Sequence, residues 1–121
     1  MKGSTMISSI ERLHTSSRMS KIVIHNDVVY LCGQVGNRGD TIEEQCIEAL
    51  SRVETLLLEA DTSKHQILQT IVWLKNMDDF DAMNKVWEDW IPEGFAPARA
   101  CGRSEMASEE LLVEFTVTAA K

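Results

Sequence analysis

The stretch from Leu111 to Ala119 alternates between apolar and more polar residues, and this alternation constrains the fold more than any other segment does. Successive side chains of a β-strand point to opposite faces of a sheet, so the pattern predicts a strand with one core-facing side. The core-facing set is Leu111, Val113, Phe115, Val117 and Ala119. The opposite, mainly polar face consists of Leu112, Glu114, Thr116 and Thr118. This face could be exposed to solvent, be buried in a subunit contact or belong to a functional site.

Several segments have the composition of β-strands. They are rich in β-branched and aromatic residues, and turn residues such as Asn26 and Asp27 separate them. The run over residues 67–74 is typical of an interior strand, because it combines Ile, Val and Trp side chains. The predicted strands are residues 6–13, 21–25, 28–32, 67–74, 97–105 and 110–119.

Two helices are predicted between these strands. Thr41 and Glu44 have capping-box spacing, and the apolar residues that follow recur at helical intervals. A second helix is expected after Asp78, with Pro92 and Gly94 at its end. Each helix therefore has one face to bury. The apolar stripes are Cys46, Ala49, Leu50, Val53, Leu56, Leu57 and Ala60 in the first helix and Phe80, Met83, Trp87, Trp90 and Ile91 in the second.

The order of these elements predicts a single α+β domain over residues 1–121. Strands, helix, strand, helix and two strands place both helices on one face of a sheet of about six strands. A chain of 121 residues has no further element to cover the other face. We therefore expect the protein to self-associate through its sheets.

The charge balance excludes some classes of partner. The chain has 12 basic and 19 acidic residues and a net charge of −7, which disfavours binding to nucleic-acid phosphates and to anionic membranes. No apolar stretch approaches the roughly 20 residues of a membrane span. Residues 1–6 also lack the apolar core of a secretory signal. We expect a cytoplasmic protein that binds neither nucleic acid nor membrane.

The cysteine and histidine residues show no pattern of a disulfide framework or a metal site. Three cysteines and three histidines are scattered without CxxC or other ligand spacing. We therefore predict free thiols and no metal site. These residues are Cys32, Cys46, Cys101, His14, His25 and His65.

Arg99 is the leading candidate for a ligand-binding residue, because its neighbours Pro97, Ala98 and Ala100 leave space around it. A guanidinium group can donate two hydrogen bonds to one carboxylate, so this arrangement suggests a small anionic substrate. A structural arginine that pairs with a carboxylate of the protein would give the same pattern.

Three other polar positions have ordinary structural explanations beside functional ones. Asn84 lies next to the apolar stripe of the second helix, where a hydrogen bond to a nearby loop would satisfy its amide. Cys101 would share a strand face with Arg99, and without a histidine partner it is expected to pack or to make a polar contact rather than to act as a nucleophile. Arg103 would share that face too, and an ordinary ion pair explains it equally well.

In combination, several short segments resemble the reactive intermediate deaminase family, also called Rid or YjgF and often labelled endoribonuclease L-PSP. Each segment is only a few residues long, and their order and spacing carry the resemblance. The stretch from Trp87 to Trp90 is similar to a shorter branch of the family. The matching segments are residues 29–35 (Val-Tyr-Leu-Cys-Gly-Gln-Val), residues 43–45 (Glu-Glu-Gln), residues 77–80 (Met-Asp-Asp-Phe) with Asn84, residues 97–101 (Pro-Ala-Arg-Ala-Cys) and residues 113–115 (Val-Glu-Phe).

The resemblance implies a chorismate-mutase-like fold that assembles as a homotrimer, with the sheets around a central β-barrel and clefts between subunits. It also implies hydrolysis of reactive enamines and imines, such as 2-aminoacrylate, to a 2-keto acid and ammonia without a cofactor. The arginine that holds the substrate carboxylate would be Arg99, and the glutamate that orients water would be Glu114. The pocket positions of the family correspond here to Cys101, Asn84, Gly33 and Cys32.

The chain departs from the family pattern at two places. A Gly-Pro-Tyr segment, whose tyrosine lines the family pocket, is replaced by residues 17–20 (Ser-Arg-Met-Ser), and Cys32 stands where serine is usual. Arg18 could reach the cleft instead of the tyrosine or be a solvated surface residue. Besides a deaminase, the sequence allows a noncatalytic protein that binds small carboxylates such as 2-keto acids. A ribonuclease is disfavoured, because the chain is acidic and shows no basic groove.

Overall fold

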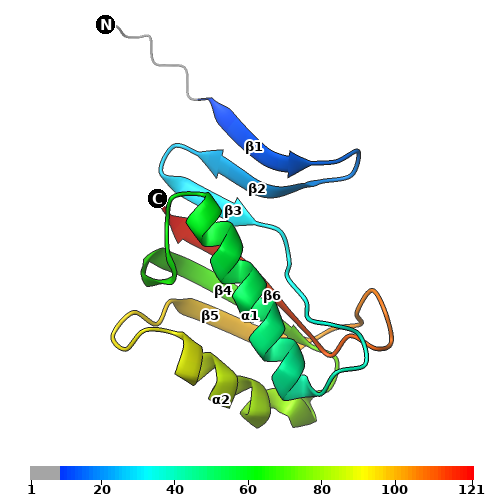
Figure 1. The fold of residues 1–121 in the computed structure, drawn as a ribbon. Helices are drawn as coiled ribbons and strands as arrows, with labels where there is room; N and C mark the ends of the chain where they lie inside the picture. The colour runs from blue at the N-terminus through cyan, green and yellow to red at the C-terminus, as the bar shows by residue number, and fades with distance from the viewer. Residues whose placement is uncertain (1–8) are drawn as a thin grey trace, which may run out of the picture.

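The computed structural model describes residues 9–121 and shows a six-stranded mixed sheet with two α-helices over one of its faces (Figure 1). The strand order is β1-β2-β3-β6-β4-β5. Strands β4 and β5 are parallel, and the other neighbouring strands are antiparallel. The elements are β1 (Ile10–Thr15), β2 (Ser20–His25), β3 (Val28–Leu31), α1 (Ile42–Glu59), η1 (Lys64–Gln66), β4 (Ile67–Leu74), η2 (Met77–Asp79), α2 (Phe80–Trp90), β5 (Ala98–Arg103) and β6 (Val113–Ala120).

The predicted sheet and helices are confirmed, while some element ends differ by a few residues. Strand β4 spans the predicted residues 67–74. Of the first predicted strand, residues 6–8 lie outside the described residues, and β1 continues to Thr15. Strand β6 begins at Val113 rather than at residue 110, because a turn precedes it in which the Leu111 amide donates to the Ser108 carbonyl at 3.1 Å.

The hydrophobic core lies between the sheet and the two helices. The predicted alternation in β6 is present, since Val113, Phe115, Val117 and Ala119 are buried and the residues between them are half-buried. In α2, Trp87 stacks on Phe115 with the ring centroids 6.1 Å apart. This aromatic contact holds α2 against the middle of the sheet.

Helix α1 begins at the predicted capping box. The Glu44 amide donates to Oγ1 of Thr41 at 3.2 Å, and the Thr41 amide donates to Oε1 of Glu44 at 3.0 Å. Two amides that have no partner inside the helix are thereby satisfied. Helix α1 has 18 residues, and no helix within residues 9–121 is both long and apolar enough to cross a membrane.

Gln45 lies in the first turn of α1 and is fully buried although its side chain is polar. Its Nε2 donates to the carbonyl groups of Asp40 and Glu110, each at 3.0 Å, and its Oε1 accepts from the Leu112 amide at 2.8 Å. Gly36 lies so close that a Cβ there would stand 2.6 Å from the Gln45 Cα atom. Gln45 therefore joins the loop before α1, the helix itself and the segment before β6.

The second face of the sheet has no helix over it in the described part of the chain (Figure 1). Tyr30 of β3 and Trp73 of β4 lie on this uncovered face, where 47% and 39% of their surfaces are exposed. Glu114 and Thr116 of β6 share the same face, because their neighbours in the strand are buried on the other. Large exposed aromatic side chains on a sheet face are typical of an interaction surface. Assembly as a homotrimer through this face remains a prediction.

We predict that Gln45→Leu lowers the free energy of unfolding by about 2 kcal/mol, because two carbonyl groups and one amide lose their partner in a partly buried region. Urea denaturation followed by circular dichroism, at the same protein concentration for each variant, measures this change. The matched control is Gln66→Leu, since Gln66 is exposed and its replacement should alter the free energy by less than about 0.5 kcal/mol. Equal effects of the two variants would contradict the role given to Gln45.

Candidate functional site

Arg99 lies on β5 and extends over the helix-covered face of the sheet toward α2. One terminal nitrogen donates to Oδ1 of Asn84 at 2.7 Å, and the other lies 3.7 Å from the sulfur of Met83. The guanidinium carbon stands 5.6 Å from the centroid of the Trp87 ring, a cation–π distance. These three contacts orient the guanidinium group and leave Arg99 half-buried.

Within residues 9–121, no carboxylate forms an ion pair with Arg99. The interpretation of Arg99 as the partner of a protein carboxylate therefore has no support in this part of the chain. A guanidinium group has five N–H donors, so donors remain for an external anion. The contact of Asn84 also differs from the one expected, since its amide oxygen accepts from Arg99 rather than bonding to a loop.

Cys101 follows Arg99 on the same face of β5 and packs against the hydrophobic core. Burial raises the pKa of its thiol above the ordinary value, and the positive charge of Arg99 offsets only part of this effect. The thiol is therefore protonated at neutral pH and is a weak nucleophile, in agreement with a packing role. Among residues 9–121, no group of three or more His, Cys, Asp or Glu side chains is placed to hold a metal ion.

Glu114 lies on β6 and meets the segment that follows β3. A Cβ at residue 33 would stand 1.9 Å from Oε2 of Glu114, so Gly33 leaves the space that the carboxylate fills. Next to it, Nε2 of Gln34 donates to the sulfur of Cys32 at 3.1 Å. Burial raises the pKa of the Cys32 thiol, while Lys21 and Gln34 lower it in part and Glu114 raises it further. Three of the predicted site residues, Glu114, Gly33 and Cys32, thus form one cluster, which we call the Glu114 cluster.

The structure places the two predicted catalytic residues on opposite faces of the sheet. Arg99 pairs with Thr70 of β4, which in turn pairs with Val117 of β6 on the helix-covered side. Glu114 pairs with Trp73 of β4 on the uncovered side. Directly opposed residues on neighbouring strands share a face of the sheet. Within one chain, the sheet therefore lies between the side chains of Arg99 and Glu114.

Two residues that contact Arg99 were not predicted as site residues, because their apolar side chains suggest only a core role. Met83 and Trp87 belong to the predicted core stripe and are buried, yet they also support the guanidinium group. The three-residue spacing between Asn84 and Trp87, which places both on one side of the helix, is the signal in the sequence. Arg18, in contrast, is exposed in the connection between β1 and β2.

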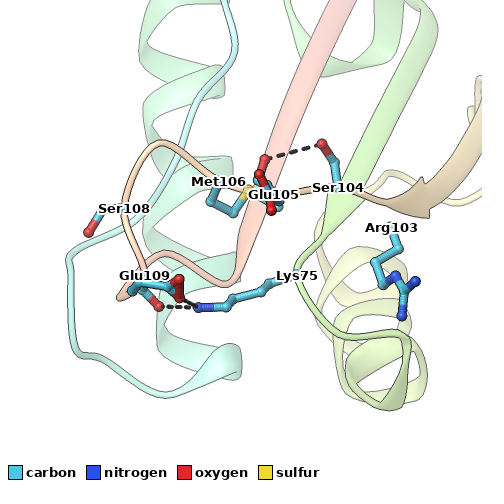
Figure 2. Close-up of a pocket in the computed structure, with 7 residues that line it drawn as sticks. All are labelled: Lys75, Arg103, Ser104, Glu105, Met106, Ser108 and Glu109. Atoms are coloured by element: carbon cyan, nitrogen blue, oxygen red, sulfur yellow. Dashed lines mark hydrogen bonds and ion pairs between the residues drawn. The ribbon is translucent and has the colours of Figure 1, made fainter.

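A separate cavity of about 520 Å³ lies where β4 and β5 end (Figure 2). Lys75 and Arg103 line it together with the loop over residues 104–109. The Lys75 amino group donates to the Glu109 carbonyl at 2.7 Å and pairs with the carboxylate of the same residue. Arg103 is exposed and forms no ion pair with another residue in 9–121, so the pairing considered for it is not found there. None of the predicted catalytic or pocket residues lines this cavity.

Known proteins are similar to the chain over nearly its full described length. The family model for endoribonuclease L-PSP matches residues 9–121. A RutC family protein from Haemophilus ducreyi is 33% identical over 112 residues, which cover 92% of this chain and 96% of that protein. The RutC family protein YoaB of Escherichia coli is 31% identical over 112 residues, which cover 93% of this chain and 98% of that protein.

The fold is also similar to that of a known protein. A YjgF family member from Neisseria meningitidis, known from a crystal structure, is 34% identical to the chain. The two structures superpose with a TM-score of 0.91, and the match covers 93% of this chain and 95% of that protein. The sequence matches and the structural match thus agree with the segments on which the resemblance rests. The chain belongs to the endoribonuclease L-PSP family, whose members include the RutC and YjgF proteins.

Proposed function

We propose that the protein is a hydrolytic deaminase of reactive enamines and imines that carry a carboxylate, such as 2-aminoacrylate. The observation that carries the proposal is the half-buried guanidinium group of Arg99, which Asn84 and Trp87 orient and no carboxylate within residues 9–121 neutralises. A bidentate contact with a substrate carboxylate would satisfy this charge. The resemblance to reactive intermediate deaminases supports the choice of substrate class.

The proposed chemistry needs binding, orientation and one activated water. 2-Aminoacrylate tautomerises to an imine, and protonation of the imine nitrogen makes the adjacent carbon electrophilic. Water adds to that carbon, the carbon–nitrogen bond breaks, and pyruvate and ammonia leave. Arg99 would hold the acid end of the substrate, and the carboxylate of Glu114 would accept a proton from the attacking water.

The proposed site takes residues from two copies of the chain. Arg99 and Glu114 lie on opposite faces of one sheet, so a molecule as small as 2-aminoacrylate cannot contact both within one chain. Strand β5 is an edge strand, which places Arg99 where a neighbouring subunit can approach it. In a homotrimer with clefts between subunits, each cleft would combine Arg99 of one subunit with Glu114 of the next.

A noncatalytic protein that binds small carboxylates such as 2-keto acids is the second candidate. It would use the same unpaired Arg99 and would not need Glu114. Saturable binding of pyruvate, measured by calorimetry, without faster release of the corresponding 2-keto acid from any of several amino-acid-derived imines would favour this candidate over the deaminase.

We predict that Arg99→Ala lowers the enzymatic rate of pyruvate release by about 100-fold, because a charge-assisted bidentate contact stabilises the bound substrate by about 3 kcal/mol. A pyridoxal-phosphate dehydratase generates 2-aminoacrylate from serine in the assay, and the spontaneous rate is subtracted. Arg103→Ala is the matched control, since Arg103 lies exposed on the same strand and should keep the wild-type rate. Wild-type activity in a folded Arg99→Ala oligomer would contradict the role of Arg99.

A mixture of two variants, each with one of the two proposed catalytic residues replaced, tests whether the site is shared between subunits. We predict that trimers containing both Arg99→Ala and Glu114→Gln chains, co-expressed with different tags and purified through both tags, recover about one third of wild-type activity, because one cleft of each mixed trimer is intact. Light scattering confirms the oligomeric mass. Doubly tagged trimers of Arg99→Ala alone are the control and should keep the roughly 100-fold lower rate of that variant. Absence of recovery in the mixed trimers would place Arg99 and Glu114 in separate sites.

A further inference from the structure

The two helices together have a net charge close to that of the whole protein. Together α1 and α2 contain eight carboxylates and two basic side chains, a net charge of −6, whereas the whole chain has −7. Both helices cover the face of the sheet opposite to the one through which we propose that the subunits associate (Figure 1). The acidic helix layer would therefore face solvent in the assembled protein.

An apolar groove of about 240 Å³ opens in this acidic layer between α1 and α2. Its walls are Ile47 and Leu50 of α1 and Val86 and Trp90 of α2, and Asp89 lines it as well. Ile47 exposes 60% of its surface, and Trp90 is half-buried. The groove thus offers accessible apolar walls with a carboxylate beside them, and it has room for one large apolar side chain.

Further carboxylates flank the groove along α1. Glu43 and Glu54 continue the helical row of Ile47 and Leu50 at three- and four-residue intervals, so they lie on the same side of the helix. At the Glu43 end, burial raises the pKa of Asp79, and the charges of Asp78 and Glu43 raise it further. The carboxylates of Glu43, Glu54 and Asp89 thus lie beside the apolar walls of the groove.

Lys64 of the chain itself contacts one end of this surface. The Lys64 amino group lies 5.2 Å from the centroid of the Trp90 ring and 3.7 Å from Oε1 of Glu54. This arrangement combines a cation–π contact with an ion pair. The surface is thus suited to lysine or arginine side chains that lie over its apolar residues.

We propose that the groove between α1 and α2 docks a basic segment of another protein. One large apolar side chain of the segment enters between Ile47 and Trp90, as in helix-in-groove recognition. Lysine or arginine side chains on either side of it pair with Asp89 and Glu43. Burial of this apolar side chain would stabilise the complex, and charge complementarity would orient the segment and select against other partners.

Other occupants of the groove are disfavoured by charge. A second copy of the chain would bring its own helix layer, with a net charge of −6, against a layer of the same charge. Anionic lipid and nucleic acid would be repelled for the same reason. The proposal is independent of the deaminase site, because none of the groove residues contacts Arg99 or belongs to the Glu114 cluster.

The test uses a labelled helical peptide of about 15 residues, built from lysine and alanine with one central phenylalanine. Fluorescence anisotropy with the full-length protein at physiological salt measures its affinity. We expect Ile47→Ser in the protein, or serine in place of the phenylalanine in the peptide, to weaken binding about tenfold, since each removes most of the apolar contact. Because Ile47 is exposed, Ile47→Ser should fold normally, and the peptide substitution tests the same contact on the wild-type protein.

A pair of charge variants separates docking in the groove from general attraction. Asp89→Asn should weaken binding several-fold, whereas Glu88→Gln, which removes the same charge from an exposed residue of α2 that does not line the groove, should change it by less than about twofold. Equal effects of these two variants, or a phenylalanine peptide that binds no better than its serine counterpart, would overturn the proposal. Failure of the phenylalanine peptide to bind at all would overturn it as well.

Discussion

The side-chain amide of Gln45 fixes the relation between segments that are far apart in the sequence. Its hydrogen bond to the Leu112 amide holds the start of β6 against the first turn of α1. Immediately beyond, Gln34 and Phe115 exchange two backbone hydrogen bonds of 2.8 and 2.9 Å, which join β6 to the segment after β3. Glu114 lies between these two attachments, so the position of its carboxylate follows from them. A polar residue in the core thus sets the geometry of a residue on the uncovered face.

The alternation of side chains in β5 and β6 divides the candidate site into two halves with different environments. Arg99 lies over the helix-covered face, where Asn84 and Trp87 compensate for the partial loss of water around its charge. Glu114 lies on the uncovered face, where Gly33 leaves the space for its carboxylate. The contacts of each half come from one chain, so a cleft that combines both halves would need two chains. In this arrangement, activity would depend on subunit association rather than on a conformational change.

The sequence predicted those features that depend on local periodicity. Apolar residues two apart in β6 and three or four apart in the helices report which side is buried, and the capping box at Thr41 needs only its own residues. The contacts of Arg99 could not be predicted in this way, because they depend on the register of β5 against β4 and on the packing of α2. The partner of Asn84 and the opposite faces of Arg99 and Glu114 are set by these tertiary relations. Local patterns do not contain them.

Charge and hydrophobicity are distributed so that the two faces of the domain favour different contacts. The uncovered sheet face presents Tyr30 and Trp73, while the helix layer concentrates a net charge of −6. Association of two helix layers would place like charges together in a region of reduced solvent, which costs free energy. Association through the sheet face avoids this repulsion and buries aromatic surface. The acidic helices therefore disfavour self-association through their own face, and the same charge would favour a partner of opposite sign at the groove beside Ile47.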